Sequence, residues 1–204
     1  MTPAAGNPAP RRAVVPGMSS RLLIVHGYRA SVRAHWFPWL EREAEALGAT
    51  VTRVVLPDAM APDAAAWRSS VGEALGAARG PGRLVVVAHS LGCITALRAV
   101  AATGTRVDGA VLVSGFVEHL PALPALDGFL GEEPGSVVAE AAPHLGAVHV
   151  VRSDDDPFVP ATATDALASA LGAPVDVVPG GRHFLASEGF TELPVVGRLV
   201  RSLL

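Results

Sequence analysis

Short apolar runs alternate along this sequence with longer stretches rich in Ala and Leu. The clearest run is Leu84–Ala88, which is apolar at every position. A strand with one solvent-exposed face alternates apolar and polar residues, so an unbroken apolar run is typical of a strand covered on both faces. A helix-like stretch from Leu91 to Thr103 follows almost at once. A buried strand followed directly by a helix is the repeating unit of a parallel sheet with helices on its faces.

The same alternation continues over the rest of the chain. Asp63 is well placed to cap one of the expected helices. Further strands are expected over residues 21–25, 50–56, 110–113, 147–151 and 175–178, and helices over 36–47, 63–79, 162–171 and 194–204. This order predicts an α/β fold, a three-layer α/β/α sandwich around a mostly parallel, twisted sheet of about six strands. Ligands of such sheets bind at the carboxyl ends of the strands.

Composition and charge narrow the class of protein. Of the 204 residues, 50% are hydrophobic and 17% are charged, which is typical of a globular domain. The net charge of −3 predicts neither nucleic-acid binding nor attraction to an anionic membrane surface. Cys93 is the only cysteine, which excludes an internal disulfide. No apolar run approaches the roughly 18 residues that a membrane span needs.

Two segments stand outside the regular alternation. Residues 1–20 are rich in Pro, Ala and Gly and lack the apolar region of a signal peptide. We therefore expect a flexible tail over 1–20, one domain over 21–204, and a cytoplasmic location. Residues 116–135 contain three prolines and leave the expected sheet just after a strand. This insertion is equally consistent with a lid over a site and with a surface excursion that has no catalytic role.

The segment around Ser90 has the pattern of a strand-to-helix turn that exposes a serine. Ala88 and Gly92 stand two residues on either side of Ser90, which matches G-x-S-x-G except that alanine replaces the first glycine. Small residues at these places let the strand and the helix approach closely, and strained backbone at the turn projects the hydroxyl above the sheet. The strand before and the helix after are the context that the motif requires. Ser90 is therefore the predicted nucleophile.

A serine hydroxyl is a weak nucleophile until a neighbouring base takes its proton. In folds with this turn the chain order is Ser, then Asp or Glu, then His. His183 follows the expected strand 175–178 on a glycine-containing loop, and an acidic loop follows the expected strand 147–151. His183 is therefore the predicted general base, and the acidic loop is expected to supply the residue that orients it.

Three adjacent aspartates, Asp154–Asp156, compete for that orienting role. Asp156 is the predicted acid, because its Asp-Pro-Phe-Val-Pro setting resembles the D-x-x-V-P pattern that accompanies this turn, and Asp155 is the alternative. A solvated acidic turn is the structural alternative for the loop as a whole. A calcium loop is not indicated, because its ligands alternate along the chain.

Two backbone N–H groups are expected to stabilise a developing oxyanion. One belongs to Leu91, the residue after the predicted nucleophile, and the other to Tyr28, in the loop after the first strand. Trp36, Phe158 and Phe184 are candidate walls of a substrate pocket, although the helical spacing of Trp36 also fits core packing.

The remaining candidate residues are assigned structural roles more readily than chemical ones. His26 and His89 flank the predicted site and are expected to make structural hydrogen bonds, whereas His35 is a possible substrate contact. Cys93 lies one helical turn after the predicted nucleophile and is expected to be an inert core thiol. No histidine pair has metal-ligand spacing with an acidic partner, so no metal or cofactor is expected.

With these motifs in place, the chain resembles the YdeN-like and retinoblastoma-binding protein nine family of small serine hydrolases, from about Arg21 to the C-terminus. The resemblance implies a compact α/β-hydrolase fold with little lid and the triad Ser90, Asp156 and His183. Ala88 and Arg182 depart from the usual pattern, the latter by lengthening the loop before His183. The matching blocks are His26–Ser31, His35–Leu40, His89–Cys93, Ser153–Phe158 and Gly180–Phe184.

These observations predict a serine hydrolase that acts on small-molecule esters, in the manner of a carboxylesterase, through an acyl-enzyme. The alternatives are an acyltransferase or thioesterase with the same residues, and a binding or regulatory protein that keeps the fold with little activity. A protein partner is not implied, because the L-x-C-x-E motif linked with the animal relative is not carried over: Leu91–Thr95 lacks its final glutamate.

Overall fold

The computed structural model describes residues 19–204, so nearly all of the expected tail, residues 1–18, lies outside the described part of the chain. One sheet of six parallel strands, in the order β2-β1-β3-β4-β5-β6, forms the centre of the fold. The strands are β1 (Arg21–Val25), β2 (Thr50–Val54), β3 (Leu84–His89), β4 (Val107–Val113), β5 (Leu145–Ser153) and β6 (Val175–Val178). The predicted sandwich and its parallel sheet are confirmed.

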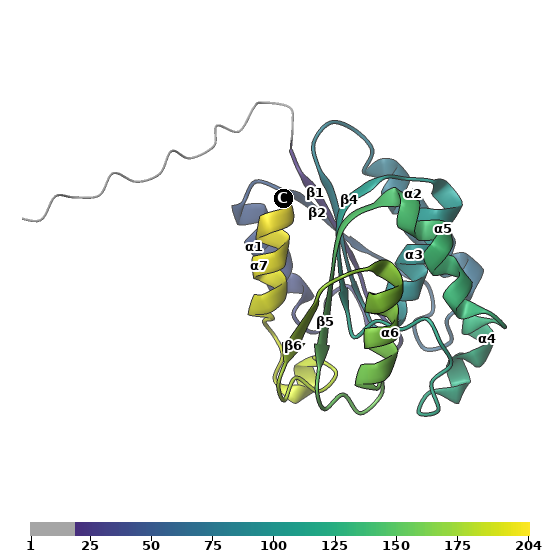
Figure 1. The fold of residues 1–204 in the computed structure, drawn as a ribbon. Coiled ribbons are helices and arrows are strands. Elements are labelled where there is room, and N and C mark those ends of the chain that lie inside the picture. The colour runs from purple at the N-terminus through teal and green to yellow at the C-terminus, as the bar shows by residue number, and fades with distance from the viewer. Residues whose placement is uncertain (1–18) are drawn as a thin grey trace, which may run out of the picture.

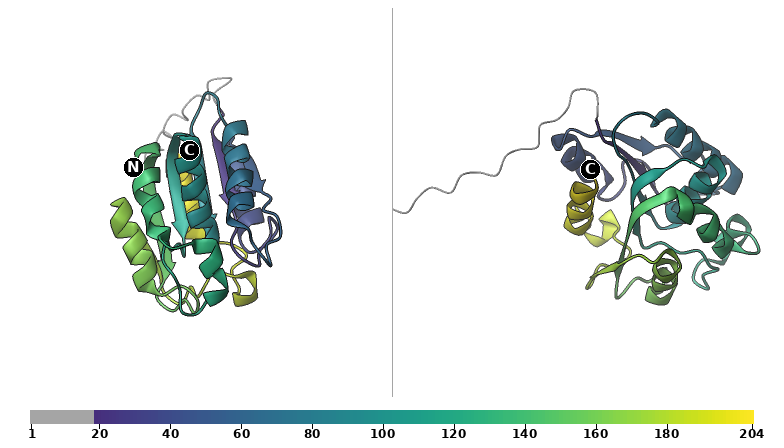
Figure 2. Two further views of the ribbon diagram at one scale, coloured as in Figure 1. Left: turned by 90° about the vertical axis from the view of Figure 1, so that its right-hand side faces the viewer. Right: turned by 45° about the horizontal axis from the view of Figure 1, so that its top comes forward.

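Two layers of helices cover the sheet (Figure 1). The long ones are α1 (Phe37–Ala46), α2 (Ala64–Ala77), α3 (Leu91–Thr103), α6 (Ala161–Leu171) and α7 (Pro194–Leu203). Helices α1 and α7 pack on one face, and α2, α3 and α6 pack on the other together with the short α5 (Val137–Ala141). The left view of Figure 2 shows the second group lying across the front of the sheet.

The central strands are mostly apolar because each contributes side chains to the cores on both faces of the sheet. In β1, Leu23 and Val25 join the core beneath α2 and α3, whereas Leu22 and Ile24 join the core beneath α1 and α7. This alternation follows from the period of two along a strand. Strands β4 and β5 are longer than expected, since their pairing extends back to Val107 opposite Leu145.

The direction in which successive strands are added reverses between β1 and β3, and this position is the topological switch point of the sheet. From β1 the chain moves outward to β2 and then returns to the other side of β1 to form β3. The loops after β1 and β3 therefore leave the sheet in opposite directions and frame a crevice at their carboxyl ends, where ligands of such folds bind. The loops after β4, β5 and β6 begin at the same edge of the sheet, because all the strands are parallel.

The insertion over residues 116–135 is more ordered than the sequence indicates. It contains the short helices η1 (Pro124–Leu126) and α4 (Asp127–Leu130) and the first residues of η2 (Pro134–Ser136), and its apolar side chains Phe116, Leu120 and Leu130 are buried in the core. The Arg98 guanidinium on α3 donates hydrogen bonds to the carbonyls of Phe129 and Leu130. Spaced prolines and buried apolar residues thus produce a packed segment on the core.

Residues 19–204 include no helix that is both long and apolar enough to cross a membrane.

The predicted cap of α2 is confirmed and is open to a stability test. The Asp63 carboxylate accepts a hydrogen bond of 2.7 Å from the Ala66 N–H, which has no partner within the helix. Asp63→Ala is expected to lower the free energy of unfolding by about 1 kcal/mol. Asp63→Asn, which keeps a capping oxygen, is expected to lose much less. Urea unfolding of the three proteins measures the difference, and equal losses for Ala and Asn would contradict a capping role.

Candidate active site

Ser90 occupies a strained turn between β3 and α3. Its backbone has φ 56° and ψ −127°, a region that non-glycine residues rarely adopt. Its N–H donates to the Val113 carbonyl at 2.8 Å, which ties the turn to the end of β4. A Cβ atom on Gly92 would lie 2.7 Å from the Val25 carbonyl oxygen and 2.5 Å from that of His26, so only glycine lets α3 start this close to β1.

His183 lies between Ser90 and Asp156. Its Nδ1 is 2.7 Å from Asp156 Oδ2, and its Nε2 is 3.1 Å from Ser90 Oγ. A carboxylate only accepts hydrogen bonds, so Nδ1 carries the ring proton and Nε2 presents a lone pair to the serine hydroxyl. All three groups are almost completely buried. The structure therefore brings the three predicted residues together in the order that proton abstraction from serine requires.

Asp156 is held as an anion by a full set of donors. Burial opposes ionisation, but the hydrogen bond and charge of His183, together with the Val159 and Phe158 N–H groups, outweigh it and hold the pKa of Asp156 below its ordinary value. Both N–H groups donate to Oδ1 at 2.9 Å. The Ser114 hydroxyl donates to Oδ2, also at 2.9 Å. The sequence analysis did not predict this role for Ser114. Its position directly after the end of β4, at the carboxyl edge of the sheet, is the feature of the sequence that could have indicated it.

The other two aspartates of the acidic loop serve the loop that carries His183. Asp154 accepts from the Gly180 N–H at 2.8 Å, and Asp155 accepts from the Arg182 N–H at 2.7 Å. Asp155 thus contacts the backbone beside His183, and only Asp156 reaches its ring. Asp154 and Asp155 are exposed to solvent, but each carboxylate of the acidic loop also has a defined hydrogen-bond partner.

Glu188 is a further residue that sequence reasoning missed. Its carboxylate accepts from the N–H groups of His183 and Leu185, both at 3.0 Å, and pairs with the Arg182 guanidinium at 3.2 Å. Arg182, the residue that departs from the family pattern, adopts φ 47° and keeps its side chain outside the site. The longer loop is accommodated because this carboxylate and the aspartates bind its backbone.

The two N–H groups that are predicted to bind the oxyanion make no hydrogen bond within the described part of the chain. Among residues 19–204, neither the Tyr28 N–H nor the Leu91 N–H donates a hydrogen bond. The Leu91 N–H is the first of α3, where no intrahelical acceptor exists and where the positive end of the helix dipole lies. These groups remain available to an oxygen bound beside Ser90.

A cavity of about 300 Å³ opens above these residues. Its walls are Tyr28, Arg29, His35, Ser90, Leu123, Phe158, His183, Leu185 and Ser187. Phe158 lines it as predicted, with its ring edge-on to the His183 ring at 5.2 Å.

Trp36 and Phe184 differ from the expectation that they line the pocket. Both are fully buried in the core beneath α1 and α7. Trp36 packs edge-on against Phe37 with ring centres 4.7 Å apart, and Phe184 packs edge-on against Phe190 at 5.4 Å. Their proximity in sequence to site residues does not bring them to the cavity, because both side chains are buried in this core.

The histidines behind the site make the expected structural bonds. His26 Nδ1 donates to the Gly27 carbonyl at 2.9 Å, and His89 Nε2 donates to the His183 carbonyl at 3.0 Å. Burial lowers the pKa of both rings, and nearby His183 lowers that of His89 further. Protonated His89 would carry a second N–H at Nδ1, which has no hydrogen-bond partner among the described residues.

Cys93 lies on α3 and is fully buried. Its thiol donates to the Ala88 carbonyl at 3.3 Å, and burial raises the pKa of the thiol. Because the thiolate is the reactive form, this environment fits the predicted inert role. Over residues 19–204 there is no group of three or more His, Cys, Asp or Glu side chains that could hold a metal ion.

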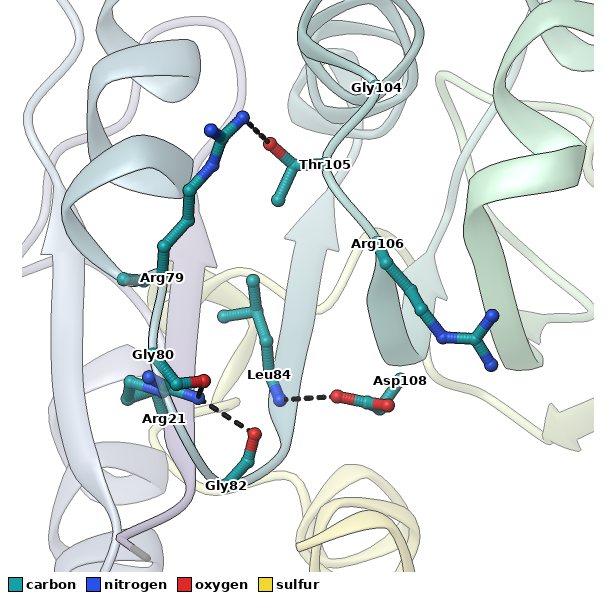
Figure 3. Close-up of a pocket in the computed structure, with 10 residues that line it drawn as sticks. Arg21, Arg79, Gly80, Gly82, Leu84, Gly104, Thr105, Arg106 and Asp108 are labelled. Carbon is teal, nitrogen blue, oxygen red and sulfur yellow. Dashed lines mark hydrogen bonds between the residues drawn. The ribbon is translucent and has the colours of Figure 1, made fainter. Parts of the chain in front are cut away.

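A second hollow, of about 450 Å³, lies at the opposite end of the sheet (Figure 3). Arg21 donates to the carbonyls of Gly80 and Gly82 there, and Arg79 donates to the Thr105 hydroxyl. No histidine, serine or cysteine lines it. Although it is larger, it lacks a nucleophile paired with a base, so the candidate active site is the cavity above Ser90.

Fold and site together define an α/β hydrolase. Residues 22–202 match the family model described as serine hydrolase, and the chain belongs to this family. It is 37% identical over 182 residues to YdeN of Bacillus subtilis strain 168, covering 88% of this chain and 93% of the relative. The predicted resemblance to YdeN-like serine hydrolases is confirmed.

Solved structures agree with this assignment. The crystal structure of B. subtilis YdeN superimposes with a TM-score of 0.82 at 33% identity and covers 91% of this chain and 98% of that chain. Est1E from Butyrivibrio proteoclasticus has a TM-score of 0.71 at 16% identity, covering 92% of this chain and 87% of its own. At that identity the second match shows the fold alone.

Acid is expected to destabilise the protein through the histidines buried behind the site. His26 and His89 titrate below 6.5 in the folded protein but near this ordinary value when unfolded. The unfolded chain therefore binds more protons below that pH, and the free energy of unfolding falls as the pH drops from about 7 to about 5. The limiting slope is about 1.4 kcal/mol per pH unit for each histidine. Urea unfolding at a series of pH values measures it.

Two variants distinguish the contribution of these buried histidines to the pH dependence from that of the other histidines. His89→Gln keeps a donor for the His183 carbonyl but cannot titrate, so its slope is expected to be shallower than that of the wild type. His119→Gln removes an exposed histidine that does not line the cavity. The hydrogen bond to Asp127 raises the pKa of His119, so this histidine opposes the acid loss and the variant is expected to lose stability at least as steeply as the wild type. Equal slopes in the wild type and His89→Gln would overturn the assignment.

Proposed function

We propose that the protein hydrolyses carboxylic esters of small molecules through an acyl-enzyme on Ser90, with His183 as base and Asp156 as the residue that orients it. The observation that carries this proposal is the 3.1 Å contact between His183 Nε2 and Ser90 Oγ, with Nδ1 of the same ring on Asp156 at 2.7 Å. Membership of the serine hydrolase family supports the same chemistry.

In the first half-reaction Ser90 Oγ attacks the ester carbonyl while its proton passes to His183 Nε2. The carbonyl oxygen becomes an oxyanion, which accepts hydrogen bonds from the Tyr28 and Leu91 N–H groups. The tetrahedral intermediate then breaks its bond to the alkoxy group, which takes the proton from His183 and leaves as an alcohol. Ser90 is left acylated.

In the second half-reaction water repeats the sequence on the acyl-enzyme. His183 takes a proton from the water as it attacks, and returns it to Ser90 Oγ as the acyl bond breaks. The products are a carboxylic acid and free enzyme. Asp156 stays ionised throughout and stabilises the imidazolium that forms twice in the cycle.

The cavity favours esters as the substrate class. Its apolar walls, Leu123, Phe158 and Leu185, suit the hydrocarbon part of an acyl or alkoxy group, and its volume suits a small substrate. Est1E is also solved with ferulic acid bound, and another structural neighbour belongs to a study of lipolytic enzymes, LipS and LipT. These names support ester hydrolysis in proteins of the same fold.

A fluorophosphonate probe tests the nucleophile. The wild type is expected to form a covalent Ser90 adduct with loss of fluoride, and to hydrolyse a short-chain 4-nitrophenyl ester. Ser90→Ala is expected to lose the label and nearly all turnover. Ser69→Ala, which removes an exposed hydroxyl on α2, serves as the matched control and is expected to keep both. Folded wild-type protein that takes no label would refute the proposal.

The choice of acid is tested by a pair of neighbouring substitutions. Asp156→Asn is expected to lower kcat by about four orders of magnitude, because an amide favours the wrong histidine tautomer. Asp155→Asn alters only a bond to the Arg182 N–H and is expected to lower kcat far less. Steady-state kinetics on one ester compares them. A larger loss in Asp155→Asn would reverse the assignment of the two aspartates.

A further inference from the structure

The cavity above Ser90 has an uneven distribution of charge. The residues that line it include Arg29 and two histidines but no Asp or Glu. Asp156 lies behind His183 with its side chain only 3% exposed and its oxygens occupied by donors. Glu188, the other carboxylate close to the cavity, does not line it and is occupied by the His183 and Leu185 N–H groups and by the Arg182 guanidinium. Arg29 is therefore the only Lys, Arg, Asp or Glu among the residues that line this cavity, although the protein as a whole is negatively charged.

Arg29 is held in place without being neutralised. Its N–H donates to the Ala59 carbonyl at 2.9 Å, its backbone adopts φ 56°, and its guanidinium lies over the Tyr28 ring at 5.0 Å. Among residues 19–204 the guanidinium has no carboxylate within ion-pair distance and no hydrogen-bond acceptor. Arg152 and Arg182, by contrast, each pair with a carboxylate.

His35 supplies a neutral donor at the same cavity. Its Nδ1 accepts a hydrogen bond of 3.0 Å from the Ala186 N–H, so the ring hydrogen is on Nε2. Burial and the neighbouring His183 lower the pKa of His35 to about 4, which keeps the ring uncharged near neutral pH. Nε2 has no acceptor among the described residues, and the Ser187 hydroxyl lines the same wall.

We propose that the natural ester carries an anionic oxygen-rich group, a carboxylate or a phosphate, that binds the Arg29 guanidinium at the mouth of the cavity, assisted by the His35 Nε2–H. This inference rests on the proposed ester hydrolysis at Ser90. A planar guanidinium pairs with either anion through two parallel hydrogen bonds. Because Arg29 is exposed, water and salt screen the attraction to about 1 kcal/mol or less, so a preference of about three- to fivefold is expected.

Matched esters measure this preference. The acyl pair is the 4-nitrophenyl monoester of adipate against 4-nitrophenyl hexanoate, with 4-nitrophenyl 5-phosphonopentanoate as the phosphate-like arm. The leaving-group pair is 4-acetoxybenzoate against its methyl ester. After correction for spontaneous hydrolysis, the ratio of kcat/KM for the charged and neutral members is compared among variants. The arm with the larger ratio distinguishes carboxylate from phosphate.

The wild type is expected to favour a charged ester about three- to fivefold at low salt, and Arg29→Gln to reduce that ratio to about one. The ratio cancels any disturbance of the adjacent Tyr28 N–H, since both esters use it. Arg33→Gln removes an exposed arginine four residues on that does not line the cavity, and is expected to keep the wild-type ratio. Added salt is expected to lower the ratio in the wild type.

The possible outcomes distinguish a failure of this inference from a failure of the proposed ester hydrolysis. Protein that takes the fluorophosphonate label, but shows the same ratio in the wild type and Arg29→Gln, overturns the role of Arg29 and leaves ester hydrolysis standing. A preference for the neutral ester in every pair does the same. Wild-type protein that neither takes the label nor turns over any ester overturns the proposed function, and this inference with it.

Discussion

The close approach of α3 to the end of β1 is the contact on which the site depends. Gly27 and Gly92 lie where these elements meet, and a Cβ on either would collide with backbone or with Ser90. This approach points the α3 N-terminus and the Tyr28 loop at one place, with the strained Ser90 between them. The strain costs of order 1–3 kcal/mol and persists because the buried strands around it over-determine the turn. A looser junction would separate the serine from the N–H groups that we propose as its oxyanion donors.

The second constraint is the polar network that positions His183 on its loop. Four carboxylates take part, and each accepts from N–H groups of the loops it joins or from the ring itself: Asp154, Asp155, Asp156 and Glu188. Charged acceptors make stronger hydrogen bonds than neutral ones, and buried ones are costly to leave unpaired. The loop thus has one favourable arrangement, which places Nε2 against Ser90. The extra residue, Arg182, fits because its side chain lies outside this network.

Much of the site was predictable because each residue occupies a fixed place relative to a strand. Ser90 follows β3, the acidic loop follows β5, and His183 follows β6, so parallel pairing alone brings them to one edge of the sheet. Ser114 and Glu188 were not predicted, since their value lies in which carboxylate or N–H they reach across the fold. Neighbourhood in sequence was a poor guide for Trp36 and Phe184, whose side chains enter the core.

The sequence by itself determined the layers, the parallel sheet, and the order in which nucleophile, acid and base follow the strands. These properties depend on local periodicity and on the small residues around Ser90, which are visible without any distant contact. Only the tertiary structure decided that Asp156, and not Asp155, meets the ring of His183, and that Arg29 stands unpaired at the cavity. Both depend on the direction of side chains from loops that are far apart in the chain, and that direction is fixed by hydrogen bonds and packing between those loops.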